Sequence, residues 1–354
     1  MNDTNINDIR DINKFRGQTF SGYKSSEVKQ AFIKQLKNEN INGSLFWCFE
    51  LLSSGNINSI WEIIILFLGG YISISNPKLI IYCSLKIKEF NNLHKNGYIN
   101  NELLLRNNDS CRKLLAEIIF ILSASPKKPC LEKIKIIKDT DFILENISSK
   151  LKAPETKYID DIFKDDDPLE IYIPMNEFSY SLNNENKNKN LWESLYWLEW
   201  ILQYEKIAKD KNIKLLSHYR NISGINENFK KDYVWILWDI ILYNSKKEHL
   251  QYKTLYSLLE LFAYNYKPGY KQKKKSILYT AIEFIINFDN IKFKEPIIKN
   301  KELLMDKTDK INKIIKIIKT NEISPKTDYL FQNIEGKSEA EKTIEKLNKI
   351  QDLL

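Results

Sequence analysis

Apolar positions recur at helical spacing along most of the chain. The most regular stripe follows i, i+3, i+4, i+7 spacing and consists of Cys111, Leu114, Leu115, Ile118, Ile119 and Leu122. It predicts an amphipathic helix with Asp109 as its cap and Ser125-Pro126 at its end. Upstream, similar stripes predict helices that begin at about 25, 44, 58 and 77. Ser25 or Ser26 is the expected cap of the first, and Asn42-Gly43 is expected to break it.

The second half of the chain shows the same periodicity. Helices are expected over about 191–209, 231–244, 253–264 and 276–288. Two narrower stripes follow in the tail: one over 307–319, where isoleucines lie opposite regularly spaced lysines, and one over 338–354. A narrow stripe needs an apolar surface to lie on, either its own core or a partner. The candidate contacts with a partner or a second copy are Ile344, Leu347 and Leu354.

These patterns predict an all-α fold of two helical bundles. We expect an N-terminal arm over 1–24, a bundle over 25–150, a connector over 151–190, a second bundle over 191–298 and a lysine-rich helical tail over 299–354. The connector is expected because prolines and acidic residues gather there, with 169–173 as a short extended piece.

Composition agrees with a folded helical protein. Only 10 glycines and 9 prolines occur in 354 residues, fewer than a turn-rich sheet protein uses. The richest apolar runs, 60–72 and 233–243, are short for a membrane span and contain Glu62 and Asp239, so we expect them in the core. Met1 to Arg10 shows no secretory signal. The scattered cysteines are expected to be free thiols in a reducing intracellular compartment: Cys48, Cys83, Cys111 and Cys130.

A net charge of +8 permits contact with nucleic acid without requiring it. The most basic stretch, 264–275, is expected to be a solvated interhelical loop that leads into a helix start. The alternative is a loop whose tyrosines stack on bases while its lysines meet phosphates. The candidate nucleic-acid contacts are Lys267, Tyr270, Lys271, Lys273, Lys274 and Lys275, with a smaller patch at Lys127 and Lys128.

Common catalytic patterns are missing from the sequence. His94, His218 and His249 do not have the spacing of zinc ligands. Gly336-Lys337-Ser338 ends like a phosphate-binding loop, but Phe331 stands where that motif needs a glycine. The acidic residues of 160–170 are expected to form a solvated linker rather than a cation site. We therefore expect a protein that is not an enzyme and has no cofactor or metal.

The order of motifs over about 25–130 resembles a known helical domain. The motifs are Ser44-Leu-Phe-Trp-Cys-Phe-Glu-Leu-Leu-Ser-Ser-Gly55, Gly69-Gly-Tyr-Ile-Ser-Ile-Ser-Asn-Pro77 and Leu122-Ser-Ala-Ser-Pro-Lys127. They look like the C-terminal collar domain of the RarA/MgsA/WRNIP family of AAA+ replication-fork ATPases. Ser73 and Ser75 replace that family's acidic pair, and the ATPase module is missing. The resemblance implies an oligomerising bundle and carries over no catalytic residue.

Three functional hypotheses follow. The first is a non-enzymatic helical interaction and oligomerisation protein that serves DNA replication or repair. The second is a structural assembly protein such as a minor capsid or virion component, with the many aromatics and the narrow terminal stripes as contact surfaces. With its Phe15-Arg-Gly-Gln-Thr-Phe20 start and its Tyr196-Trp-Leu-Glu-Trp200 helix, the chain is also similar in style to uncharacterised proteins of large DNA viruses of protists. The third is an enzyme with an unrecognised site. Protein partners or self-association are expected, in the cytoplasm, the nucleus, a viral factory or the virion.

Overall fold

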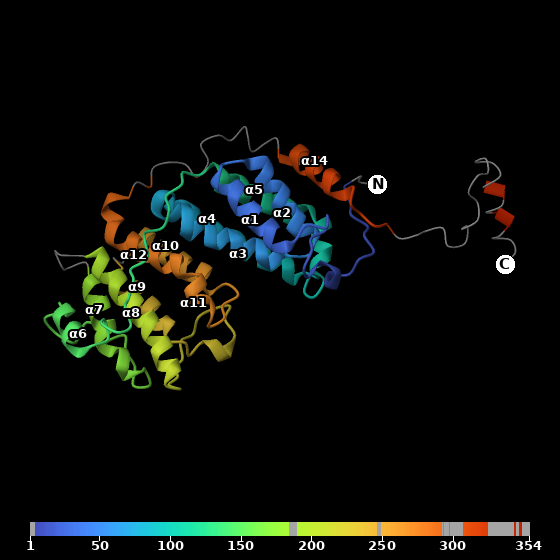
Figure 1. Cartoon of the computed structure of the whole chain (residues 1–354). Coiled ribbons are helices and arrows are strands. Elements are labelled where there is room, and N and C mark those ends of the chain that lie inside the picture. The colour runs from blue at the N-terminus through green and yellow to red at the C-terminus, as the bar shows by residue number, and fades with distance from the viewer. Residues whose placement is uncertain are drawn as a thin grey trace.

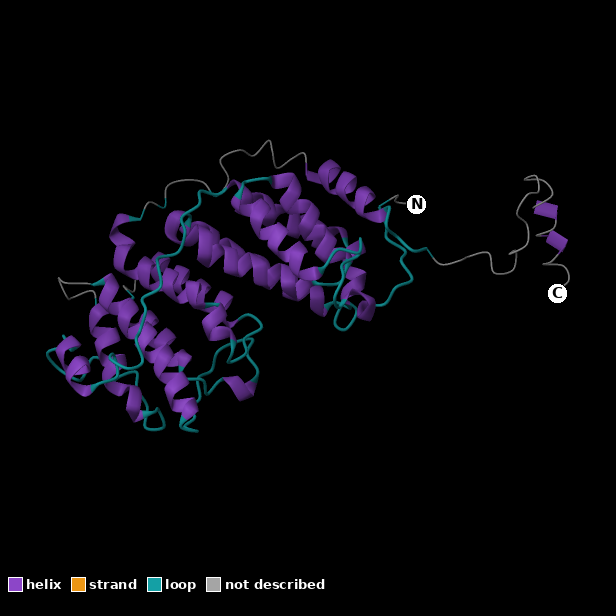
Figure 2. Cartoon of the chain, viewed as in Figure 1, coloured by secondary structure: helices purple, strands orange, loops and turns teal. Residues whose placement is uncertain are grey.

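The computed structural model describes residues 4–183, 190–245, 249–291, 293, 297, 307–324, 343–344 and 347–348. Within these residues the chain is all-α, with two isolated β-bridges and no strand (Figure 2). The helices form two lobes that lie side by side (Figure 1). We call them the N-lobe, which contains α1 to α5 and α14, and the C-lobe, which contains α6 to α12.

The N-lobe contains most of the first bundle that the sequence predicts. Its helices are α1 Ser25–Lys37, α2 Ile41–Ser53, α3 Ile57–Phe67, α4 Pro77–Lys95, α5 Asp109–Ala124 and α14 Lys307–Lys319. The shorter helices are η1 Ile12–Phe15, η2 Leu68–Ile72, η3 Ser73–Ser75 and η4 Glu102–Asn107.

The C-lobe is built on α8, the tryptophan-rich helix. Its helices are α6 Leu144–Lys150, α7 Tyr172–Leu182, α8 Leu191–Asp210, α9 Val234–Tyr243, α10 His249–Ala263, α11 Tyr270–Lys273 and α12 Lys275–Asn287. The shorter helices are η5 Leu169–Ile171, η6 Glu227–Phe229 and η7 Phe288–Asn290.

Helix starts differ from the sequence prediction by up to four residues, the largest difference being α10, which begins at His249 rather than at about 253. Asn108, not Asp109, caps α5 by accepting the amide N–H of Cys111 at 2.8 Å. Neither serine caps α1, because Lys24 is extended at the cap position and Ser25 is already helical. Asn40 caps α2 by accepting the N–H of Gly43 at 3.0 Å, which places Asn42-Gly43 in the first turn of α2.

The region predicted as a connector contributes a helix to the C-lobe. Residues 169–173 are helical rather than extended, and α7 packs along α8. Glu177 on α7 is buried and accepts the backbone N–H groups of Lys152 and Ala153, which holds the preceding loop against the lobe. The acidic linker is also not wholly solvated. Asp167 is buried, and the Arg220 guanidinium donates to both of its carboxylate oxygens at 2.8 and 2.7 Å.

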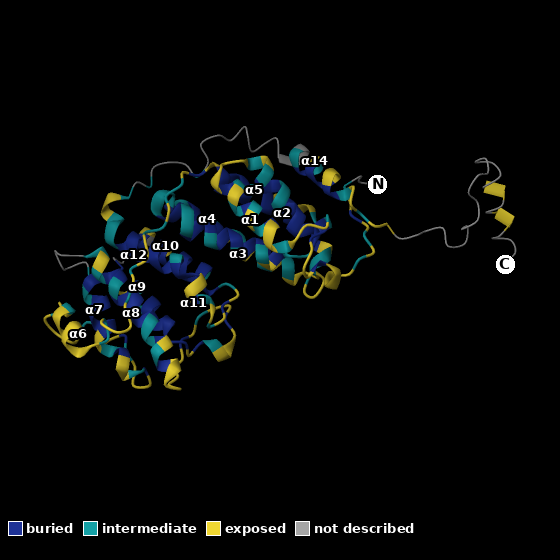
Figure 3. Ribbon diagram, viewed as in Figure 1, coloured by how far each residue is buried: buried dark blue, intermediate teal, exposed yellow. Residues whose placement is uncertain are grey.

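A continuous hydrophobic core joins the two lobes (Figure 3). Helix α4 of the N-lobe packs against α10, and η2 packs against α12. The run Ile57–Ser75 is the one helical stretch in the described part of the chain that is long and apolar enough to cross a membrane. Its most apolar window is 61% buried inside the protein, which agrees with the predicted core position.

The adjacent glycines of η2 have opposite surroundings. A Cβ at Gly69 would lie 2.6 Å from Ile277 Cδ1 and 3.1 Å from the Ile277 backbone nitrogen, so α12 can approach η2 closely only because this residue is glycine. A Cβ at Gly70 would meet no atom within 4 Å. Gly69 is therefore part of the packing between the lobes, and Gly70 faces open space.

We expect Gly69→Ala to lower the free energy of unfolding by about 1–3 kcal/mol, the usual cost of overpacking. Gly70→Ala should leave it unchanged or raise it by up to about 1 kcal/mol, since alanine favours a helix. Urea denaturation of both variants measures the difference. Equal stabilities would show that η2 and α12 do not meet as described.

Candidate binding cleft and the lysine-rich segment

Residues 264–269 of the lysine-rich segment form a loop in which Asn265, Lys267 and Gly269 are exposed, but three of the lysines that follow are not solvated. Residues 270–273 form α11, and Lys271, Lys274 and Lys275 are buried at 2%, 2% and 8% exposure. The prediction that these lysines project toward solvent is wrong. Each ammonium group instead has acceptors inside the protein.

Lys271 lies at the centre of a buried network of charges. Its Nζ is 2.6 Å from Glu205 Oε1 and 3.0 Å from Asp232 Oδ1, and it lies over the Tyr233 ring. The hydroxyls of Tyr233 and Tyr266 donate to the same two carboxylates at 3.2 and 2.9 Å. Burial alone would raise the pKa of Glu205, but Lys271 and Lys209 outweigh it and hold that pKa below its usual value.

The neighbouring lysines also have acceptors within the protein, either carboxylates or backbone carbonyl oxygens. Lys275 Nζ donates to Glu199 Oε2 at 2.8 Å, and the Tyr279 hydroxyl donates to Glu199 Oε1 at 2.5 Å. Lys274 donates to carbonyl oxygens at the C-terminal end of α10, and burial lowers its pKa to about 8. Lys273 pairs with Glu62 of α3.

The two lysines of the smaller basic patch, Lys127 and Lys128, also donate to acceptors inside the protein. Lys127 caps the C-terminal end of α5 by donating to the carbonyls of Leu122, Ser123 and Ser125. Lys128 pairs with the buried Glu283 of α12 at 2.6 Å. Of the eight candidate nucleic-acid contacts, only Lys267 is exposed with no described partner, and Tyr270 is half-buried.

We expect Lys271→Met to lower the free energy of unfolding by about 3–5 kcal/mol, because it leaves two carboxylates buried without their cation. Lys267→Met, four residues earlier in the same segment, should change it by less than about 0.5 kcal/mol. Thermal or urea unfolding of the pair measures this. Similar small losses in both would mean that Lys271 is solvated.

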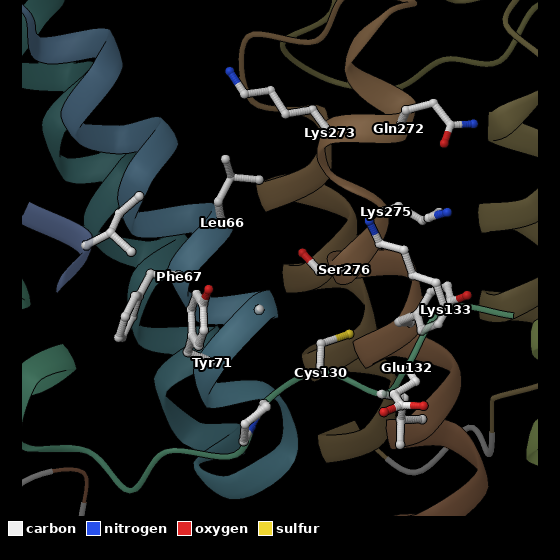
Figure 4. A pocket seen from close by; sticks show the side chains of 15 residues that line it. Leu66, Phe67, Tyr71, Cys130, Glu132, Lys133, Gln272, Lys273, Lys275 and Ser276 are labelled. Atoms are coloured by element: carbon white, nitrogen blue, oxygen red, sulfur yellow. The ribbon is translucent and has the colours of Figure 1, made fainter. Parts of the chain in front are cut away.

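A cleft of about 560 Å³ lies where the two lobes meet (Figure 4). Leu66, Phe67 and Tyr71 from α3 and η2 form one wall. The opposite wall comes from α11 and α12, where Ser276 turns its hydroxyl toward the cleft. The segment 129–133 crosses between the walls. The lining is completed by Ile33, Gly70, Pro129, Cys130, Leu131, Glu132, Lys133, Gln272, Lys273, Lys275 and Tyr279.

Backbone hydrogen bonds fix the crossing segment against the N-lobe. The N–H of Lys128 donates to the carbonyl of Tyr71 at 2.8 Å, and the N–H of Cys130 donates to that of Gly70 at 2.9 Å. Because Lys128 also pairs with Glu283, one short segment ties η2 to α12. The cleft walls are therefore held by hydrogen bonds and ion pairs.

The cleft carries little reactive chemistry. Cys130 is the one cysteine of the four that is not fully buried, and burial raises its pKa to about 11, so its thiol stays protonated at neutral pH. Among the described residues, no three His, Cys, Asp or Glu side chains gather as metal ligands do. His94 stacks on Phe90 in the last turn of α4, and His218 contacts the exposed Asp166.

The candidate residues for contact with a partner or a second copy lie in the tail. Ile344 and Leu347 are 58% and 59% exposed. Leu354, the Gly336-Lys337-Ser338 motif and the His249 side chain lie outside the described residues. Four isoleucines of α14, in contrast, are buried against α2 and α5: Ile311, Ile314, Ile315 and Ile318.

Comparison with known proteins found no matching family model, no matching curated protein and no matching solved structure. The resemblance of residues 25–130 to a clamp-loader-like collar therefore stays a prediction.

Proposed function

We propose that this chain is a non-enzymatic interaction protein that takes an apolar group of its partner into the cleft between the lobes. The observation that carries the proposal is the cleft's size together with its lining. Its volume, about 560 Å³, lies within the roughly 300–1,000 Å³ of typical ligand pockets. Aliphatic and aromatic side chains from three separate parts of the chain line it.

The charges around the cleft favour an apolar occupant. Lys273 is neutralised by Glu62 and Lys275 by Glu199, both within the protein. The two remaining charged residues of the lining, Glu132 and Lys133, have opposite sign and are exposed. The cleft therefore has little net charge to offer a ligand, and burial of apolar surface is the main source of affinity.

The hydrogen bonds and ion pairs that hold the walls support a preformed binding site. A site held by backbone hydrogen bonds and buried ion pairs loses little freedom when a partner enters, which favours affinity. The protonated Cys130 thiol is a poor nucleophile. Both features suit a preformed recognition site.

Replication or repair accessory and virion component remain proposals for the setting of this interaction. Contact with DNA through 264–275 has lost its support, since the buried ammonium groups there are already paired. Contact through the tail is a second candidate, favoured by the exposure of Ile344 and Leu347.

The cleft can be tested with Cys130 as a reporter and Nile red as an apolar probe. Bound Nile red should fluoresce saturably and slow the alkylation of Cys130 by iodoacetamide by roughly tenfold or more, since the thiol lies in the wall. Gly70→Trp should abolish both effects by filling the cleft from a position with free space.

Gly17→Trp is the matched control, because a Cβ at Gly17 also meets nothing within 4 Å and lies away from the cleft lining. Circular dichroism checks that both variants fold. The proposal fails if Nile red binds to the Gly70→Trp protein as to the wild type, or if Cys130 reacts at the same rate with and without saturating probe.

A further inference from the structure

A second hollow lies on the C-lobe, where α9 packs beside α10 (Figure 1). Its volume is about 220 Å³, and it shares no lining residue with the cleft between the lobes. The apolar part of its lining comes from both helices and includes Leu242, Leu259 and Ala263. The hollow is therefore a separate place at which an apolar side chain can be buried.

The cations at this hollow are already neutralised by carboxylates. The Arg220 guanidinium donates from Nε to Asp239 Oδ2 at 2.6 Å and from Nη2 to the buried Asp167 at 2.7 Å. Two carboxylates thus share one guanidinium, and the Asp239 side chain stays half-exposed. Glu260 has one cationic partner, Lys88 of α4, at 2.6 Å. Three carboxylates therefore accompany two cations.

An acidic segment lies beside the hollow. Residues 160–167 contain five aspartates and one lysine, and Arg220 holds the segment in place by pairing with Asp167. Four of the aspartates are exposed and form no ion pair with a lysine or arginine of the described residues: Asp160, Asp161, Asp165 and Asp166. Lys164 instead donates to the carbonyl of Asp161 at 3.3 Å. In a chain of net charge +8, this segment carries uncompensated negative charge.

Exposed tyrosines lie on the same surface. Tyr252 and Tyr256, one turn apart on α10, stack on one another at 6.1 Å and are 44% and 39% exposed. Tyr256 lines the hollow. The exposed Tyr243, at the end of α9, donates its hydroxyl to Asp161 of the acidic segment at 2.8 Å. Tyrosine is enriched at protein interfaces, where its ring gives a large contact area at a small cost in entropy.

The combination of carboxylates and exposed rings is complementary to arginine. A guanidinium is planar, so it stacks on a tyrosine ring and also pairs with a carboxylate through two parallel hydrogen bonds. This chain offers few such groups itself, because it has five arginines and three of them, Arg106, Arg112 and Arg220, are at most 8% exposed. The occupant that fits therefore belongs to another protein.

We propose that this surface, formed by residues 160–167, the stacked pair Tyr252 and Tyr256, and the hollow between α9 and α10, binds an arginine-containing basic segment of a partner protein. The exposed carboxylates pair with guanidinium groups, the tyrosine rings stack on them, and an apolar side chain of the same segment enters the hollow. The proposal does not depend on the function proposed for the cleft between the lobes.

The test measures fluorescence anisotropy with the full-length protein and three fluorescein-labelled peptides of equal length: GRRLRRG, GKKLKKG and GEELEEG. The arginine peptide should bind saturably and roughly fivefold or more tightly than the lysine peptide, since a guanidinium stacks on a ring as well as pairing with a carboxylate. The acidic peptide should not bind. Equal affinities for the arginine and lysine peptides, or binding of the acidic peptide, would overturn the proposal.

A pair of double variants locates the charges that matter. Asp165→Asn with Asp166→Asn should weaken binding of the arginine peptide roughly fivefold, because it removes two exposed charges and breaks no ion pair with a lysine or arginine. The matched control, Asp139→Asn with Glu145→Gln, removes two exposed carboxylates from another segment and should bind as the wild type does. The same affinity in both double variants would contradict the proposal.

Nitration with tetranitromethane places the peptide on the wild-type protein without any substitution. At saturating arginine peptide, Tyr252 and Tyr256 should be nitrated roughly tenfold or more slowly than in the free protein. Tyr23 in the N-terminal arm is the internal control, because it is 45% exposed and lies on the other lobe. Unchanged rates at Tyr252 and Tyr256 would show that the peptide binds elsewhere.

Light scattering tests a second copy of the chain as the occupant. The free wild-type protein should show no association that depends on the acidic segment. Association that Asp165→Asn with Asp166→Asn abolishes would assign the surface to a second copy, and the proposal of a different partner protein would be overturned.

Discussion

Buried carboxylates on the C-lobe helices have to be neutralised, and this requirement positions the rest of the structure. Glu199 and Glu205 lie on α8, and Asp232 lies before α9, in surroundings made largely of tryptophan, leucine and isoleucine. An unpaired carboxylate there would cost several kcal/mol. Lys271 and Lys275 supply the missing cations. The segment that carries them is thereby fixed on α8, and with it the start of α12.

The placement of α12 determines the cleft. Helix α12 approaches η2 at Gly69, and its Glu283 receives Lys128 from the segment that crosses between the lobes. The Ser73 hydroxyl donates to the same carboxylate at 2.9 Å, which adds a contact from η3. The ion pairs of α8 and α12 therefore hold both walls of a cavity whose lining is mainly apolar.

Local patterns in the sequence were sufficient for most of the long helices, but not for α7, which lies in the region predicted as a connector. The stripe of α5 and the isoleucine stripe of α14 both lie where the periodicity places them, because the spacing of apolar residues along a helix is a local property of the sequence. The residues that cap the helices could be predicted less well. Asn108 and Asp109 are equally suited by residue type, and only the backbone geometry determines which of them accepts the amide N–H.

The lysine-rich segment could not be placed in this way. Lys271 pairs with a residue 66 positions earlier, and no local pattern reports such a pairing. The acidic partners of these lysines did carry a signal in the sequence. Glu199 and Glu205 interrupt a helix whose tryptophan and leucine stripes indicate burial on two sides. Acidic residues in such a helix need cations, and the basic stretch 264–275 is one source of them. No pattern in the sequence predicted the cleft, because its two walls come from parts of the chain more than 200 residues apart.

Lysine accessibility tests the internal pairing most directly. Acetylation of the native wild-type protein with N-hydroxysuccinimidyl acetate, followed by peptide mass spectrometry, reports the rate at each lysine. Lys271, Lys274 and Lys275 should react roughly tenfold or more slowly than Lys267 and Lys133, because their ammonium groups are buried and hydrogen-bonded. Reaction of Lys271 and Lys275 at the rate of Lys267 would contradict the account, since these lysines would then face solvent.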